Sequence, residues 1–255
     1  MPDPAAAPVA ARESGLGATQ RTDAWWAGPL VTALALVAFF FVYAPLRTIH
    51  NKFYEWGPLL SPFYSPLIKW DGMPPWLSPA MIILPFPGLF RLTCYYYRKA
   101  YYRSLFADPL ACGVGEARKG YCGETRFPFV LQNLHRYALY IALVFNVILW
   151  VDAVKAFFWP DGFHMSVGTL VLIANAFLLM CYSLSCHSLR HLIGGNLDCF
   201  AKAAFGQCRF SAWKGASWMN ERHMLWAWVS LVGVGFADFY VWMVASGAWT
   251  DFRIF

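Results

Sequence analysis

Five long apolar stretches constrain this chain more than any other feature of its sequence. They cover residues 28–49, 79–102, 129–158, 165–193 and 220–246. Each is close to the roughly 20 residues that an α-helix needs to cross the hydrocarbon core of a bilayer. Charged residues make up only 13% of the chain, about half of the ~25% that is usual in soluble domains. The sequence therefore predicts an all-α membrane protein, a bundle of five transmembrane helices, and excludes an ordinary soluble enzyme.

The segments around these stretches indicate one membrane domain behind a short tail. Residues 1–24 are rich in Ala and Pro and lack a basic region followed by an apolar core, which predicts a flexible tail rather than a signal peptide. Residues 25–255 form the single domain. Pro85 and Pro87 remove backbone donors from the second stretch and should kink or break it. Asn220 is the expected N-cap of the last helix.

Lys and Arg are distributed unevenly between the loops. Residues 91–136 hold eight of them and residues 190–222 hold five, whereas residues 51–78 hold two and residues 150–165 hold one. Cytoplasmic loops carry the excess of Lys and Arg, so the first two segments are expected in the cytoplasm. Five crossings then place the N-terminus inside and the C-terminus outside, in a multi-pass protein of the inner (plasma) membrane. The net charge of +6 follows from this orientation and does not indicate a nucleic-acid partner.

Cysteine and histidine side chains gather near the cytoplasmic ends of the predicted helices. These residues are Cys94, Cys112, Cys186, His135, His187, His191 and His223. Ionisable side chains and metal ligands are costly inside a membrane, so the cluster indicates a redox centre within the bundle. His187 and His191 are four residues apart and share one helix face, whereas Cys186 should point elsewhere, about 100° around that helix.

Two cofactors fit a cluster of this composition. A b-type haem needs two axial histidines from facing helices, and a Rieske-type [2Fe–2S] centre needs two Cys on one iron and two His on the other. The Cys-x-His and Cys-x-x-His pairs of soluble Rieske domains do not occur here, so such a centre would have to be assembled from separate helices. Spacing alone favours haem. Without a cofactor, the histidines would hydrogen-bond one another and backbone carbonyls between helices.

Three further side chains lie on the opposite side of the predicted membrane. His50, Tyr54 and Trp56 follow the first apolar stretch. They are candidates for a quinone pocket, because quinone carbonyls need hydrogen-bond donors. The alternative is that they anchor the chain at the membrane interface, where amphipathic aromatic rings are enriched.

Four sequence segments with unusual combinations of residues resemble segments of a known family. They are FRLTCYYYRKAYYR (90–103), GETRFPFVLQNLHRY (123–137), LSCHSLRH (184–191) and NERHMLWAWVSL (220–231). Together they resemble the membrane-anchor (C) subunit of actinobacterial-type succinate dehydrogenases, a branch of complex II. The resemblance covers the chain from about residue 20 to its end.

The resemblance implies a subunit of a succinate:quinone oxidoreductase rather than an independent enzyme. Such anchors sit among membrane lipids, dock a flavoprotein subunit and an iron–sulfur subunit on the cytoplasmic side, and pass electrons from succinate to menaquinone or ubiquinone. Broader five-span anchors carry two haems, whereas the actinobacterial type holds a Rieske-type [2Fe–2S] centre. Cys94 stands where a haem anchor would have a histidine, so the expectation moves from haem to iron–sulfur.

The resemblance leaves the ligand set open, with thiols among the three cysteines of the cluster and imidazoles among its four histidines. Two other functions remain as alternatives. A transporter or channel would use the intramembrane His and Arg residues as a polar path, although paired broken helices in two halves are missing. A purely structural anchor would hold no cofactor at all.

Overall fold

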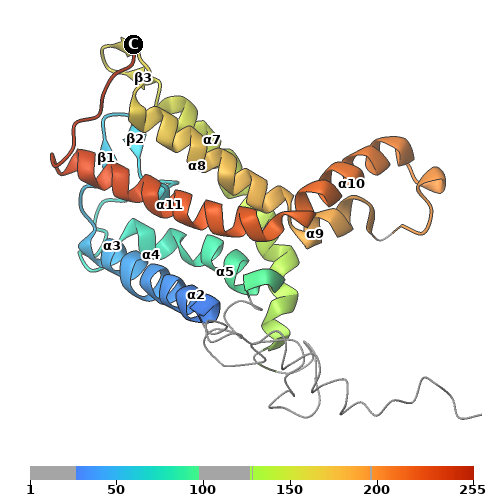
Figure 1. Cartoon of the computed structure of the whole chain (residues 1–255). Helices are drawn as coiled ribbons and strands as arrows, with labels where there is room; N and C mark the ends of the chain where they lie inside the picture. Colours follow the sequence, from blue (N-terminus) through green and yellow to red (C-terminus); the bar gives the residue numbers. More distant parts are fainter. Residues whose placement is uncertain (1–26, 98–126, 128, 196) are drawn as a thin grey trace, which may run out of the picture.

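The computed structural model describes residues 27–97, 127, 129–195 and 197–255 (Figure 1). Four of its helices are long and apolar enough to cross a membrane: Leu30–His50, Val130–Lys155, Val167–Leu184 and His223–Ala245. A shorter apolar helix covers Pro79–Thr93. The chain is therefore a multi-pass membrane protein. A fifth crossing over residues 79–102 stays a prediction, and the tail at residues 1–24 lies outside the described part.

Three long helices form the body of the bundle. Helix α8 (Val167–Leu184) packs between α7 (His135–Lys155) and α11 (His223–Ala245), and α5 (Pro85–Thr93) packs against α7 and also contacts α8 and α11. Buried alanines occupy these interfaces, because small side chains allow helix backbones to approach closely in a membrane. Examples are Ala138, Ala142, Ala176 and Ala227.

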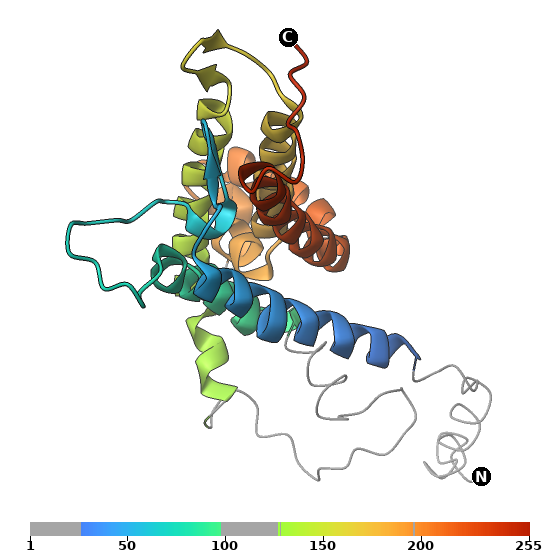
Figure 2. The same cartoon turned by 90° about the vertical axis from the view of Figure 1, so that its left-hand side faces the viewer.

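The N-terminal helix is the most exposed of the four. It runs through α2 (Ala27–Val37), a π-helical segment (Ala38–Tyr43) and α3 (Ala44–His50). It lies beside α4 (Pro79–Ile83) and α5 in both views (Figures 1 and 2). The outward row of large apolar side chains on this helix fits contact with lipid: Val31, Leu34, Phe41, Leu46 and Ile49.

Two of the predicted spans are interrupted. Helix α4 ends at Ile83 and α5 begins at Pro85, which confirms the break expected from the prolines. The prediction of one helix over residues 165–193 is wrong. Helix α8 ends at Leu184, a four-residue helix α9 (His187–Arg190) follows, and a π-helical turn (His191–Gly195) ends at the predicted double glycine.

Helix α10 (Gly206–Glu221) lies in the segment that was expected to be a loop, and it projects away from the bundle (Figure 1). A 3-10 turn (Phe200–Lys202) precedes it. The predicted N-cap is wrong: α11 begins at His223, and Asn220 lies inside α10. The Asn220 amide instead donates to the Ser185 carbonyl at 2.7 Å, which ties α10 to the end of α8.

Two small hairpins lie at the opposite end of the bundle. One pairs β1 (Glu55–Trp56) with β2 (Leu59–Leu60), and the other pairs β3 (Phe158–Trp159) with β4 (Gly162–Phe163). The C-terminal residues return to this end, where Arg253 bridges to Ser166. Two 3-10 turns complete the described elements, Pro62–Tyr64 and Phe129–Leu134. We call this end the hairpin end, and the other end the α10 end.

A buried ion pair holds the N-terminal helix to α11 near the hairpin end. Arg47 is 2% exposed and Asp238 is 0% exposed, and Arg47 Nε donates to Asp238 Oδ2 at 2.8 Å. The Asp238 carboxylate also accepts from the Tyr43 hydroxyl at 2.6 Å and from the Ser61 hydroxyl at 2.5 Å. We call these four side chains the Arg47–Asp238 network. It supplies several donors to one buried charge, which is what burying a charge requires.

Candidate metal centre

A cavity of about 200 Å³ opens at the α10 end, between α5, α7, α11 and the interruption after α8. Its lining contains two thiols, three imidazoles and three hydroxyls. The lining residues are Thr93, Cys94, Tyr95, Gln132, Asn133, His135, Cys186, His187, Ser188 and His223. We call it the Cys–His cavity. It brings together five of the seven cluster residues expected from the sequence.

Both cysteines of the cavity sit where a helix is interrupted. Cys94 is the C-cap of α5 and Cys186 is the N-cap of α9, and both have extended backbone angles. Their side chains are 2% and 1% exposed. The expectation that Cys186 points about 100° away from His187 is wrong, because Cys186 is not helical and both residues line the same cavity.

His135, the first residue of α7, faces the sulfur of Cys186. Its Nε2 lies 3.1 Å from Cys186 Sγ, and its Nδ1 lies 2.9 Å from Thr93 Oγ1. The Thr93 hydroxyl donates its one hydrogen to the Leu89 carbonyl at 2.7 Å. It must therefore accept from Nδ1–H, which leaves the Nε2 lone pair of a neutral His135 directed at the sulfur.

His223, the first residue of α11, repeats this arrangement. Its Nε2 lies 3.3 Å from Cys94 Sγ, and its Nδ1 lies 2.7 Å from Ser185 Oγ. Ser185 Oγ donates to the Tyr182 carbonyl at 2.9 Å, so it accepts from Nδ1–H of a neutral ring. Two imidazoles thus present free Nε2 lone pairs to two thiols, each fixed by a hydroxyl on its other nitrogen. This is the orientation that metal-binding histidines usually receive from their surroundings.

The other predicted cluster residues are placed differently. His187 lines the cavity but is exposed, with its ring centroid 6.0 Å from that of His223. His191 is exposed in the π-helical turn and is not among the lining residues. Cys112 lies outside the described residues. Within the described part, no group of three or more His, Cys, Asp or Glu side chains surrounds a single ion.

Sequence reasoning missed the two hydroxyls that fix the imidazoles. Thr93 directly precedes Cys94, and Ser185 directly precedes Cys186. Each hydroxyl contacts the histidine whose Nε2 faces the cysteine of the other pair. The repeated hydroxyl–Cys dipeptide is the signal that could have drawn attention to them.

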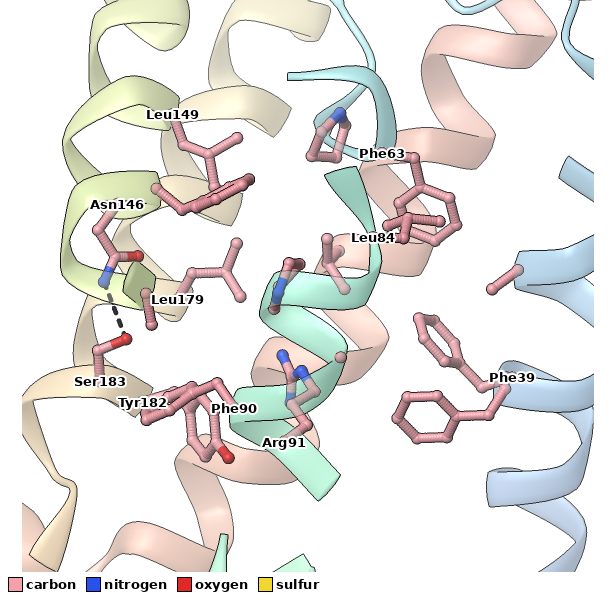
Figure 3. A pocket seen from close by; sticks show the side chains of 18 residues that line it. Phe39, Phe63, Leu84, Phe90, Arg91, Asn146, Leu149, Leu179, Tyr182 and Ser183 are labelled. Carbon is pink, nitrogen blue, oxygen red and sulfur yellow. Dashed lines mark hydrogen bonds between the residues drawn. The ribbon is translucent and has the colours of Figure 1, made fainter. Parts of the chain in front are cut away.

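A second, mostly apolar cavity of about 130 Å³ lies deeper in the bundle. Its wall includes Phe39, Phe63, Leu84, Leu149 and Leu179 (Figure 3). Polar groups enter it at two places: the Arg91 side chain, and an Asn146 amide that donates to the Ser183 hydroxyl at 2.8 Å. We call it the apolar cavity.

Two aromatic side chains separate the two cavities. Phe90 stacks on His135 with ring centroids 4.8 Å apart, and Tyr182 stacks on His223 at 5.2 Å. Both aromatic residues also line the apolar cavity. The two cavities are therefore one side-chain layer apart.

Arg91 lies between the cavities without an acidic partner among the described residues. It is 6% exposed, and its guanidinium donates to Tyr97 Oη at 2.7 Å, the Ala227 carbonyl at 3.2 Å and Ser230 Oγ at 3.0 Å. All three acceptors are neutral. A buried cation with only neutral partners stabilises a negatively charged group that comes close to it. The sequence analysis did not single out Arg91.

The three side chains proposed to contact quinone have different neighbours. The His50 ring lies 5.8 Å from Trp242, and Trp56 lies 5.1 Å from Trp159. Tyr54 stacks on Tyr64 with ring centroids 4.1 Å apart and lines a third cavity of about 220 Å³. These contacts fit packing at the hairpin end, and a quinone role for the three stays a prediction.

Comparisons with known proteins agree with the membrane architecture. The family model for the actinobacterial succinate dehydrogenase subunit SdhC matches residues 27–247. No curated protein matches the chain. Among solved structures, a chain of the Mycobacterium smegmatis Sdh1 complex in the apo form is similar, with 44% sequence identity and a TM-score of 0.84. The match covers 93% of this chain and 94% of that one.

Proposed function

The chain belongs to the family of actinobacterial succinate dehydrogenase membrane subunits SdhC, and we propose that it carries electrons through an intramembrane [2Fe–2S] centre to quinone. It is the membrane anchor of a succinate dehydrogenase complex. The observation that carries the proposal is the arrangement of two buried thiols and two oriented imidazoles around one cavity. A transporter or a cofactor-free anchor has no need of such a donor set.

The donor set fits a Rieske-type centre. Such a centre takes two Cys and two His, and the Cys–His cavity offers Cys94 and Cys186 with His135 and His223. Free Nε2 lone pairs and deprotonable thiols are the donor atoms that iron accepts from these residues. His187 is a less suitable ligand, because it is exposed and no hydroxyl of the described residues orients its ring.

The chain's own residues prepare this site before any metal enters. Thr93 and Ser185 hold the two rings, and the helix ends at Cys94 and Cys186 point the thiols into the cavity. A bound [2Fe–2S] cluster accepts and releases one electron at a time. Helices α5, α7 and α8 exclude water on the membrane side, which raises the influence of nearby charges on the centre.

A bis-histidine haem is supported less well. It needs two imidazole nitrogens that point at one iron from opposite sides. Here Nε2 of His135 faces Cys186 Sγ and Nε2 of His223 faces Cys94 Sγ. A haem held by these two nitrogens would leave both buried thiols without a role as ligands, although each thiol lies within 3.3 Å of one of them.

We place quinone in the apolar cavity. Its apolar wall suits an isoprenoid-substituted ring. The Arg91 guanidinium, whose partners among the described residues are all neutral, suits a carbonyl oxygen that gains negative charge on reduction. The layer of Phe90 and Tyr182 keeps it close to the Cys–His cavity. The competing location is the predicted group His50, Tyr54 and Trp56 at the hairpin end.

We place the soluble partners at the α10 end. The Cys–His cavity opens there, so an iron–sulfur subunit docked on this side, itself bound to a flavoprotein, would bring its last cluster near the proposed centre. Exposed and half-buried cations gather on this end, including Arg190, Lys202, Arg209 and Arg222. Lipid is expected against the exposed N-terminal helix.

Replacing both proposed imidazole ligands tests the centre. We expect the double variant His135→Ala, His223→Ala to retain the soluble subunits but to lose the low-g EPR signal of mixed Cys and His ligation, and with it quinone reduction. His191→Ala is the matched control, because this histidine lies outside the cavity, and it should keep the signal. Iron content no higher than that of the soluble subunits, or a stoichiometric b-type haem, would contradict the proposal.

Filling the apolar cavity tests the quinone site. Gly88 lines it, and a Cβ added there meets no atom within 4 Å, so Gly88→Leu should occupy the cavity without moving the backbone. We expect at least a tenfold higher KM for quinone, with succinate oxidation by a soluble dye unchanged. Gly215→Leu on α10 has the same open surroundings and should change neither. If Gly88→Leu leaves quinone kinetics intact, the hairpin-end location becomes the better candidate.

A further inference from the structure

Tyr182 carries a buried hydroxyl that the proposed relay has not yet used. The side chain is 1% exposed, and its Oη has no hydrogen-bond partner in the described part of the chain. A buried hydroxyl without a partner costs free energy, because it gave up hydrogen bonds to water and gained none. Tyr97 shows the contrast, since its hydroxyl is buried too but donates to the Ala227 carbonyl at 2.6 Å.

The Tyr182 side chain lines the apolar cavity and packs against two residues of the Cys–His cavity. The Tyr182 ring stacks on His223 at an interplanar angle of 15°, and His223 Nε2 contacts Cys94 Sγ. Cys94 and Tyr182 belong to the same buried cluster, on either side of the His223 ring that contacts both of them. In Figure 3 the hydroxyl end of Tyr182 points away from Asn146 and Leu149.

The chemistry of the Cys94 sulfur determines how well it accepts a hydrogen bond. A neutral thiol is a weak acceptor, and a thiolate bound to a metal is a strong one. The Arg91 guanidinium lies 4.7 Å from the centroid of the Tyr182 ring and draws electron density from it, which makes the O–H a better donor. The side chain is thus prepared for an acceptor that carries negative charge.

We propose that Tyr182 donates a hydrogen bond to the Cys94 sulfur when that sulfur holds iron, and thereby raises the reduction potential of the centre. The inference rests on the proposed function. A hydrogen bond to a ligand sulfur stabilises the reduced state more than the oxidised one, because the reduced centre carries more negative charge. Tyr182 is then a tuning residue, which sets how readily the centre takes an electron from the soluble partner.

An EPR-monitored redox titration of the purified complex tests this, with Tyr182→Phe compared with wild type. We expect the signal to remain at full intensity and the equilibrium constant for reduction to fall about tenfold, which corresponds to about 59 mV for one electron. Removing the hydroxyl unpairs no other described group, so the variant should assemble. Tyr64→Phe is the control: it removes a fully buried phenol oxygen at the hairpin end, which donates to the Arg47 carbonyl at 2.8 Å, and the potential should stay at the wild-type value.

An unchanged potential in Tyr182→Phe would overturn the inference, and so would an equal shift in Tyr64→Phe. Failure of Tyr182→Phe alone to assemble would overturn it as well, since the hydroxyl would then have a structural partner. These outcomes leave the wild-type signal, and hence the proposed function, intact. A wild-type complex without the signal would instead overturn the proposed function itself, together with the inference that depends on it.

Discussion

Two groups of buried polar side chains, the Arg47–Asp238 network and the residues around the Cys–His cavity, differ in how fully they are hydrogen-bonded. At the hairpin end, Asp238 meets the guanidinium of Arg47 and the hydroxyls of Tyr43 and Ser61. At the α10 end, thiols and imidazoles make contacts of 3.1 and 3.3 Å, and the Tyr182 hydroxyl has no partner in the described residues. The first region is saturated with hydrogen bonds, and the second is not.

This difference separates a structural role from a functional one. Removing one partner of a fully hydrogen-bonded buried charge lowers stability strongly, and such a charge has no free position for a ligand. The Arg47–Asp238 network therefore holds helices together. A buried site with free lone pairs is a poor source of stability and a good site for a ligand. Arg91 differs from Arg47 in that its acceptors are all neutral, so its positive charge is left to attract a negatively charged ligand.

The largest loss of stability is expected from Asp238→Ala. The change leaves the Arg47 cation buried without its counter-ion, and breaking such a pair costs about 3–5 kcal/mol. Thermal unfolding of the purified complex should show this loss, while the folded fraction should keep its full iron content. The double variant Arg47→Met, Asp238→Leu removes both charges and should recover most of the stability. A single variant as stable as wild type would show that the network is not structural.

A smaller, local effect is expected from Thr93→Val. Without the hydroxyl, His135 loses the acceptor for its Nδ1–H, and loss of such a contact typically lowers metal affinity about 10–100-fold. Iron retained during dialysis against graded chelator measures this. Thr48→Val provides the control, since Thr48 also donates to the carbonyl four residues earlier, at 2.6 Å, but is near no imidazole of the cavity. Equal iron retention in the two variants would remove the orienting role of Thr93.

The two buried arginines give a third prediction: of their two Met variants, the one that loses more stability should lose less quinone reduction. Arg91→Met leaves only neutral acceptors unpaired, so it should cost about 1–3 kcal/mol, less than Arg47→Met, which strands the Asp238 carboxylate. Quinone reduction should fall more in Arg91→Met, because its guanidinium lines the apolar cavity. Thermal unfolding and steady-state quinone kinetics of both variants measure the two effects. The reverse order in either measurement would contradict the contrast between the two ends.

The sequence predicts the apolar helices well because the bilayer imposes their length and composition. It predicts the break at Pro85 for a covalent reason, since proline lacks the backbone donor. It could not predict the interruption at Ser185 and Cys186, because residues 165–193 read as one apolar run without proline. That interruption comes from tertiary contacts, such as the Asn220 amide on the Ser185 carbonyl.

The candidate site shows the same limit. Cys94, Cys186, His135 and His223 could be named from residue type and position along predicted helices. The facts that select them are the hydroxyl contacts from Thr93 and Ser185, and these depend on how α5, α7 and α11 meet. Helix α10 was missed for a different reason: its composition is polar overall, so it resembles a loop when only apolar runs are considered.

The smallest expected effect concerns an exposed pair at the hairpin end, which unlike the buried network should contribute little. Arg253 hydrogen-bonds Asp161 and lowers the pKa of that carboxyl, with His164 as the other titratable neighbour. Because the pKa of Asp161 is lowered in the folded protein, the stabilising contribution of this ion pair is present at neutral pH. It is lost as the pH falls through the pKa that Asp161 has in the folded state. Asp161→Asn should therefore speed amide hydrogen exchange only where the C-terminal segment pairs with residues 165–167, without changing exchange within α8.

The difference from wild type should shrink toward zero as pH falls below about 4, the ordinary pKa of an aspartate. It should also shrink in 1 M salt, because exposed charges are screened. A large loss of global stability at neutral pH would show that this exposed pair contributes as the buried one does, and the contrast between saturated burial and surface pairing would fail.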